Sequence, residues 1–268
     1  MNMQVNGPMD PRMRRRRIDV IRQEGRRRLC LLVAAGSIIV VAGAALASTR
    51  SPLLDVDRIH VVGAVETPRA EVVAASGVRP GLALVDLDEA VALRGVVDLP
   101  WVRSASIARQ WPSTVTISVV ERTAVAAAPA ADSRWALVDS NGQVVAWADA
   151  PGELPPLAGL DPAGPPGSTL GAGAAGLLRV AATVPAELRP RLEAVVAGER
   201  GDVDLELQDG GRVRLGEPEQ LGEKFRSALS VLAQVDTSRL STLDVRIPQS
   251  PVLTRLDPVD TVSTLGTG

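Results

Sequence analysis

The pattern of hydrophobic and polar positions divides the chain into one long apolar run and a series of shorter, alternating segments. The run extends from Leu29 to Thr49, 21 residues without a charge, and is bounded by Arg28 and Arg50. A helix rises by about 1.5 Å per residue, so a run of this length can cross the ~30 Å hydrocarbon core of a bilayer. We therefore predict a transmembrane helix over residues 29–49, with membrane lipid around it.

A cleaved signal peptide is the alternative interpretation of this run. Ala45 and Ala47 satisfy the small-x-small rule, with Ser48 after the cut. The apolar region of a signal peptide is about 7–15 residues long, however, and this run is longer. We favour an uncleaved anchor for that reason.

Charge is distributed unevenly on the two sides of the run. Residues 1–28 hold nine arginines and three acidic residues, a net of 9 − 3 = +6, so the rest of the chain carries −2 − 6 = −8. An acidic body argues against nucleic-acid binding. The positive-inside rule places the basic tail in the cytoplasm and everything after Arg50 outside. The arginines that we expect to set this topology are Arg14, Arg15, Arg16, Arg17, Arg26, Arg27 and Arg28.

After the run, the pattern of apolar and polar positions predicts a strand, two helices and a hairpin. The strand ends at Gly63, and a first helix opens at Pro68 with Thr67 as its N-cap. A second helix over 86–96 has acidic residues in its first turn, where the helix dipole favours them. We expect its inward-facing residues to be Ala90, Val91 and Leu93.

The hairpin consists of two alternating segments, 101–109 and 115–119, around a turn at Trp111 and Pro112. We expect Trp111 to stabilise the hairpin, by ~3–5 kcal/mol if its ring is fully buried. An exposed ring would instead mark a recognition residue. The order strand, helix, helix, strand, strand predicts two helices on one face of a three-stranded sheet.

A second set of elements follows from residue 123. Segments 135–138 and 144–147 flank Asn141-Gly142, a strong hairpin signal. The stretch 149–173 is rich in proline and glycine and predicts a long loop. Further elements are a helix over 177–184, strands near 192–196, 203–207 and 213–215, a helix over 217–235, and a closing strand with Leu243, Val245 and Ile247. The overall prediction is an α+β protein.

Catalytic groups are scarce. His60 is the only histidine, which excludes a two-histidine zinc site, and we expect it at a solvent-facing strand position. Cys30 lies inside the apolar run, so no thiol is available outside for nucleophilic chemistry. The glycines between 159 and 176 lack the Gly-Lys-Ser/Thr of a phosphate loop, and Lys224 is the only lysine. We predict no enzyme, no cofactor, no metal and no small-molecule substrate.

Three motifs resemble the POTRA domain of the FtsQ/DivIB family of bacterial division proteins. They are the strand that ends at Gly63, the Pro-Trp-Val at 100–102, and the Arg-x-Trp-Pro-x-Thr at 109–114 followed by Glu121-Arg122. The resemblance implies a βααββ POTRA domain over 54–122 and a mixed, antiparallel-rich β domain with helices over 123–256. From their polar composition we expect residues 257–268 to form a disordered tail. The POTRA residues that it marks as structural are Gly63, Trp101, Arg109, Trp111, Pro112, Glu121 and Arg122.

The same resemblance implies a non-enzymatic scaffold of the divisome. Such a protein would sit in the plasma membrane at the division septum and bind other division proteins outside the cytoplasm, with partners of the FtsB/FtsL type. The alternative is a secreted POTRA protein, released by cleavage after Ala47, that chaperones transported polypeptides. Whether the purified protein begins at Met1 or at Ser48 would separate the two.

We expect the partner site at the C-terminal end of the β domain. Pro248 and Pro251 are tolerated in sheets mainly at edges and bulges, because proline cannot donate to a ladder. The segment after Pro251 would then be an edge on which another chain can add a strand. The alternative is that residues 252–256 fray. The expected contact residues are Ile247, Gln249, Ser250, Val252, Leu253, Thr254 and Arg255.

Overall fold

The computed structural model describes residues 30–43, 54–198, 201–235 and 240–255. The arginines expected to set topology and the polar tail over 257–268 lie outside the described residues, as do parts of the expected transmembrane run. Residues 30–43 are helical and their side chains are exposed. Within the described ranges, no helix is both long enough and apolar enough to span a bilayer.

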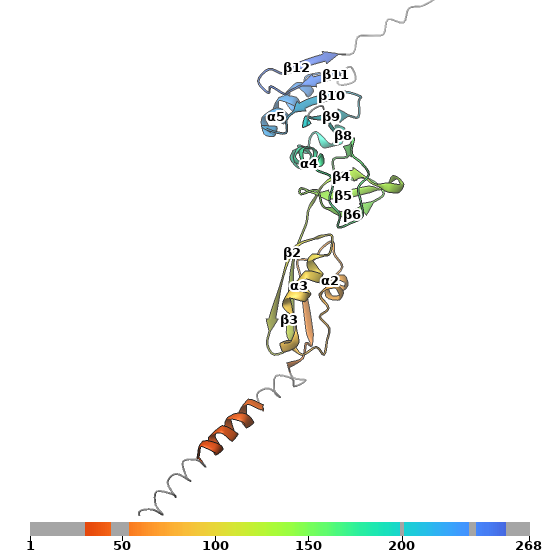
Figure 1. Ribbon diagram of the computed structural model, residues 1–268. Coiled ribbons are helices and arrows are strands. Elements are labelled where there is room, and N and C mark those ends of the chain that lie inside the picture. The colour runs from red at the N-terminus through yellow and green to blue at the C-terminus, as the bar shows by residue number, and fades with distance from the viewer. Residues whose placement is uncertain (1–29, 44–53, 199–200, 236–239, 256–268) are drawn as a thin grey trace, which may run out of the picture. The chain divides into compact units, whose positions relative to one another are not determined.

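The first part of the chain has the predicted order of strand, two helices and two strands (Figure 1). Its three strands form one sheet in the order β1-β3-β2. This arrangement confirms the α+β prediction for these residues. The elements are β1 (Arg58–Val62), α2 (Arg69–Ser76), the 3-10 turn η2 (Leu84–Asp86), α3 (Glu89–Val97), β2 (Val102–Gln110) and β3 (Thr114–Glu121).

Burial alternates along β3, as the sequence pattern predicts for a sheet with one covered face. Val115, Ile117 and Val119 are buried. In α3 the inward-facing residues differ from the prediction: Ala90 and Val91 are exposed, and Leu93 is half-buried. Ala92 and Val96 are the buried positions of α3, one helical turn apart. Asp88 caps the helix through the backbone N–H groups of residues 90 and 91, which fixes this phase.

By packing, the described chain separates into two compact units. One joins residues up to Ile59 with Arg79–Leu87 and Arg109–Val115. The other holds His60–Val78, Asp88–Ala108 and the described residues from Thr116 onward.

A three-stranded antiparallel sheet opens the C-terminal part, in the order β4-β5-β6. Its strands are β4 (Ala124–Pro129), β5 (Trp135–Asp139) and β6 (Val144–Ala148). The Asn141-Gly142 hairpin between β5 and β6 is where the sequence predicts it, and Gly142 has a φ of +87°. A 3-10 turn, η3 (Ala131–Ser133), connects β4 to β5.

A six-stranded sheet follows, in the order β12-β11-β10-β9-β8-β7 (Figure 1). The β7–β8 and β10–β11 pairs are parallel, and the other pairs are antiparallel. The elements are β7 (Leu157–Ala158), α4 (Ala174–Thr183), η4 (Arg189–Arg191), β8 (Leu192–Ala197), β9 (Val203–Leu207), β10 (Arg212–Gly216), α5 (Leu221–Leu232), β11 (Leu240–Asp244) and β12 (Val252–Arg255). Apolar side chains of both sheets, α4 and α5 share one core, in which Phe225 is the largest fully buried side chain.

Several boundaries in this part differ from the sequence prediction, and two of them have a physical reason in the structure. Helix α5 begins at Leu221 rather than 217, because Gln220 has a left-handed backbone with a φ of +50° and cannot continue a right-handed helix. Strand β11 ends at Asp244, so Ile247 is not in the closing strand. Val245 stays buried and bonds to the carbonyl of Arg214, after which the chain leaves the sheet.

Candidate partner-binding surfaces

Strand β12 is the last strand of the six-stranded sheet and pairs with β11 alone among the described residues. The register joins Leu243 to Leu253 and Asp244 to Val252. A strand paired on one side presents backbone N–H and C=O groups on the other, which is the template for strand addition. The structure thus places residues 252–255 at a sheet edge, which is the position that the partner-site prediction assumes.

Side chains around β12 are mostly exposed. Ile247 is 64% exposed and Val252 is 60% exposed. Leu253 differs, because it is half-buried and packs against the core. The other residues of the predicted partner site, all exposed, are Gln249, Ser250, Thr254 and Arg255. All seven lie on one continuous segment, and their binding role stays a prediction.

A tight turn leads into β12. The N–H of Ser250 donates to the carbonyl of Ile247 at 3.0 Å. The side-chain amide of Gln249 approaches the carboxylate of Glu223 in α5, with a nitrogen–oxygen distance of 3.5 Å. A shallow, open groove of about 630 Å³ lies between α5 and residues 248–251.

Several charged side chains lie near the end of β11, where the chain leaves the sheet before β12. The guanidinium of Arg246 donates to both carboxylate oxygens of Asp244, at 2.6–3.0 Å. These bonds hold the pKa of Asp244 below its ordinary value. Asp204 in β9 is buried, which raises its pKa although Arg214 and Arg212 act in the opposite direction.

Lys224, the sole lysine, is 5% exposed and its Nζ donates to the carbonyl of Glu217 at 2.7 Å. Burial lowers the pKa of Lys224. The bond ties the first turn of α5 to the chain that precedes it, so the geometry gives this amine a structural use.

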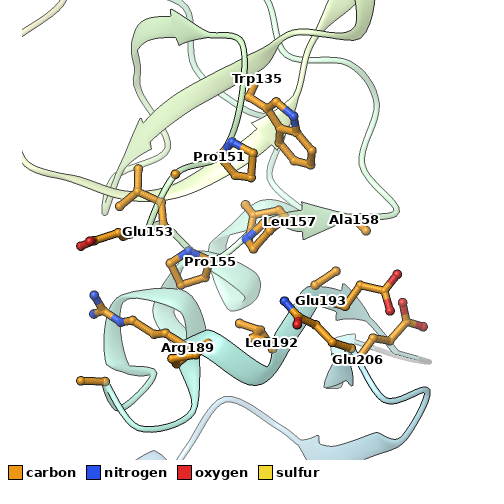
Figure 2. A pocket seen from close by; sticks show the side chains of 17 residues that line it. Trp135, Pro151, Glu153, Pro155, Leu157, Ala158, Arg189, Leu192, Glu193 and Glu206 are labelled. Atoms are coloured by element: carbon orange, nitrogen blue, oxygen red, sulfur yellow. The ribbon is translucent and has the colours of Figure 1, made fainter.

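A second groove, of about 900 Å³, lies at the β7 end of the same sheet (Figure 2). Its walls include Trp135, Pro151, Pro155 and Leu157. The charged residues that line it are Glu153, Arg189, Glu193 and Glu206. Glu206 also pairs with Arg212 across β9 and β10 at 2.6 Å. Sequence reasoning missed this groove, and the proline-rich stretch after residue 150 was its one signal.

Glu121 is the most extensively bonded of the residues that the motifs marked as structural. Its carboxylate accepts the backbone N–H groups of Val65, Glu66 and Thr67 at 2.8–3.0 Å. Partial burial raises the pKa of Glu121, but the three backbone donors outweigh burial, and the pKa lies below its ordinary value. The carboxylate thereby holds the loop between β1 and α2 against the end of β3. Thr67 does not act as the expected N-cap, because Pro68 occupies that position.

Gly63 lies in the same region, with a φ of +86°. A Cβ at this position would collide with the carbonyl oxygen of Val119, so only glycine fits. Arg109 donates from Nη2 to the carbonyl of Leu87 at 2.8 Å.

Arg122 and Trp101 meet through their main chains, since the N–H of Arg122 donates to the carbonyl of Trp101 at 2.7 Å. The guanidinium of Arg122 pairs with Asp139 at 2.8 Å. Asp139 is buried and also accepts the backbone N–H groups of Asn141 and Gln143.

Trp111 is not a core residue. Its side chain is 57% exposed at the tip of the β2–β3 hairpin, and Pro112 beside it is exposed as well. The expectation of a buried, stabilising ring is therefore wrong because the ring is exposed, and the recognition role named as the alternative stays a prediction. Trp111 lies in the turn between the end of β2 and the start of β3, outside the strands whose alternate side chains are buried.

His60 and the acidic residues were the groups to check for a metal site. His60 is exposed on β1, as expected. No group of three His, Cys, Asp or Glu side chains is arranged to hold a metal ion among these residues.

Comparison with known proteins gives two family matches. Residues 54–122 match the model described as "POTRA domain, FtsQ-type", and residues 127–246 match "Cell division protein FtsQ/DivIB, C-terminal". Together the two models match more than half of the chain.

Individual relatives agree with these matches. A protein named cell division protein FtsQ from Caulobacter vibrioides is 31% identical over 75% of this chain and 64% of its own length. Proteins of the same name from Corynebacterium glutamicum and Streptomyces collinus are 25% and 29% identical, over 77% and 86% of this chain and 91% and 90% of their own lengths. The chain thus spans somewhat under two thirds of the Caulobacter relative.

Proposed function

Because the chain belongs to the FtsQ/DivIB family of bacterial cell division proteins, we propose that it is a non-enzymatic scaffold of the divisome. In this proposal it acts by binding other division proteins outside the cytoplasm during septum formation. The contact surface is the β12 edge, and the partner adds a strand there. The single observation that carries the proposal is the position of β12, exposed and paired on one side among the described residues.

The proposal includes a single-pass anchor. The uncharged run over residues 29–49 crosses the plasma membrane, with the basic tail in the cytoplasm. Protease added to wall-stripped cells should remove the folded part and leave a protected N-terminal fragment. Protection of the whole chain would reverse the topology and contradict a scaffold that binds outside.

Strand addition at β12 would need few specific side-chain contacts. Main-chain hydrogen bonds would supply affinity, and the exposed side chains of Val252 and Thr254 would supply selectivity. Partners of the FtsB/FtsL type are the candidates that the family resemblance suggests.

Site-specific photo-cross-linking in growing cells tests the site. A photo-reactive residue at Val252 or at Thr254 should capture membrane division proteins, because both side chains would lie against an added strand. The matched control is Asp161, an exposed loop residue distant in sequence from the edge. Equal capture from Asp161, or none from either β12 position, would place the partner site elsewhere.

The secreted transport chaperone is the less favoured function, because both family matches and the named relatives are division proteins. It makes one separate prediction, a mature protein that begins at Ser48. Mass spectrometry of the purified N-terminus distinguishes it from a protein that begins at Met1.

A further inference from the structure

The tip of the β2–β3 hairpin exposes an aromatic ring that packing does not use. Trp111 is 57% exposed, whereas Trp101 and Trp135 are half-buried and Trp147 is 41% exposed beneath the guanidinium of Arg134. Single exposed apolar side chains are common on protein surfaces, so exposure alone does not assign a use. The use of this ring is instead indicated by the position of the tip, which lies near the end of the uncharged run.

Hydrogen bonds hold the tip beside the point where the chain enters the fold. The carbonyl of Ser113 accepts the N–H groups of Asp57 and Arg58, at 2.8 and 3.2 Å. Asp57 is eight residues after Thr49, where the uncharged run ends. Eight residues reach at most about 29 Å when fully extended. Trp111 is therefore tethered close to the end of the run, whatever path the intervening residues take.

A second segment joins the tip at the same place. The N–H of Val56 donates to the carbonyl of Leu82 at 2.8 Å, and the N–H of Gly81 donates to the carbonyl of Val56 at 2.9 Å. These bonds place the loop Arg79–Leu87 next to the chain entry, within one compact unit that also contains Arg109–Val115. This loop exposes Pro80 and Val85, two further apolar side chains.

The frame behind Trp111 is well anchored. Ser113 and Val115 are buried, and the guanidinium of Arg109 is bonded to the carbonyl of Leu87. The indole is thus presented on a fixed support, which lowers the entropic cost of docking it on a surface.

Charges around the tip identify the kind of surface. The exposed cations Arg58 and Arg79 are matched by the exposed anions Asp57 and Asp86. Such a balance gives no strong attraction to anionic lipid. A tryptophan ring with its N–H donor, by contrast, is enriched where hydrocarbon meets the polar headgroups.

We propose that the Trp111 tip inserts into the headgroup region of the bilayer that residues 29–49 cross. This inference rests on the proposed single-pass anchor. The contact orients the first sheet and its helices against the membrane, so that they have a defined direction rather than hanging from a tether. The ring, and not the neighbouring charges, makes the contact.

Depth-dependent fluorescence quenching of the full-length chain in phosphatidylcholine vesicles tests this inference. A variant with Trp101→Phe, Trp135→Phe and Trp147→Phe keeps Trp111 as the only tryptophan. Lipids brominated near the top of the acyl chain should quench it roughly twofold, because indole resides at that level. The matched control keeps Trp147 instead, an exposed tryptophan of the C-terminal part. It should be quenched by iodide in the water and not by bromolipid.

A second measurement is independent of whether the triple variant folds. In the otherwise native chain, Trp111→Phe should remove the bromolipid-quenched part of the emission. Bromolipid vesicles that also contain anionic phosphatidylglycerol should quench Trp111 no more than neutral bromolipid vesicles do. Quenching that requires anionic lipid and disappears with salt would overturn an indole contact.

Carbonate extraction separates failure of this inference from failure of the anchor. Protein that stays with the vesicles while Trp111 is quenched by iodide alone overturns the tip contact and leaves the anchor intact. Protein that carbonate releases from the vesicles overturns the anchor, and the tip contact with it.

Discussion

The two edges of the six-stranded sheet have opposite surroundings. At β7 the carbonyl of Pro156 accepts the N–H of Val195, and the carbonyl of Pro155 accepts the N–H of Ala127 in β4. The short edge is thereby joined to the three-stranded sheet. At β12 four residues pair with β11, and among the described residues no further strand follows. One edge is joined to the rest of the chain and the other is paired on one side only among the described residues, so the two edges differ in what covers them.

Removal of the open edge should have the largest effect on binding. A chain that ends at Pro251 lacks β12, and we expect complete loss of the cross-linked division proteins. The fold should survive, because three of the four β12 side chains are exposed. Formaldehyde cross-linking in cells, with circular dichroism of the purified protein, measures both. If this truncated chain still captures the division proteins, the open edge at β12 is not the partner site.

A cavity at the closed edge should mainly affect stability. Leu157 is fully buried in β7, so Leu157→Ala should lower the free energy of unfolding by ~2–5 kcal/mol. Urea denaturation measures the change. Leu154→Ala, in the half-buried wall of the adjoining groove, is the control and should cost less. A larger loss from the control would mean that β7 contributes little to the core.

Two neighbouring residues of β12, one packed against the core and one exposed, should contribute differently to the free energy of unfolding. Leu253→Ala should cost about 1–2 kcal/mol, because this side chain is half-buried against the core. Val252→Ala should stay within about 0.5 kcal/mol, as exposed substitutions usually do. For the same reason Leu253→Pro should shift the melting curve as well as weaken capture. Equal melting temperatures for Leu253→Ala and Val252→Ala would indicate that β12 frays.

Acid should affect the open edge slightly. The pKa of Asp244 is depressed in the folded state by Arg246, so its contribution is present above the unfolded pKa and is lost as pH falls through the folded value. Asp244→Asn should flatten that acid loss, with Glu193→Gln at the β7 groove as the control. Because the pair is partly exposed, this is the smallest expected effect. Thermal melting at several acidic pH values checks it, and an unchanged slope in Asp244→Asn would contradict it.

Elements in which apolar and polar residues alternate regularly could be predicted from the sequence, because their apolar positions are the buried ones. The β5–β6 hairpin and strands β8, β9 and β10 are confirmed near their predicted positions. The order of the first sheet and its helices is confirmed as well. Strands β5 and β6 pair with each other, and β9 pairs with both β8 and β10, so each of these strands has at least one partner close to it in the sequence.

Two strands could not be predicted, one because its partner is distant in the sequence and one because of its composition. Strand β7 has two residues inside a proline-rich stretch, and its bonds come from β8, more than thirty residues later. Strand β4 is rich in alanine, which has little preference for strands. The position of the candidate edge followed from two prolines, whereas the burial of Leu253 depends on tertiary packing.

Glu121 and Arg122 are adjacent, yet their side chains are committed to different places, one to the loop over 65–67 and the other to Asp139. Neighbouring side chains of an extended chain point in opposite directions, so this division works only at the present spacing. Inserting one residue between the two would turn one of the charges away from its partner. The length of the chain is therefore fixed here, and an engineered spacer, tag or reporter belongs at an exposed loop position outside the strands, such as Asp161 or Pro162.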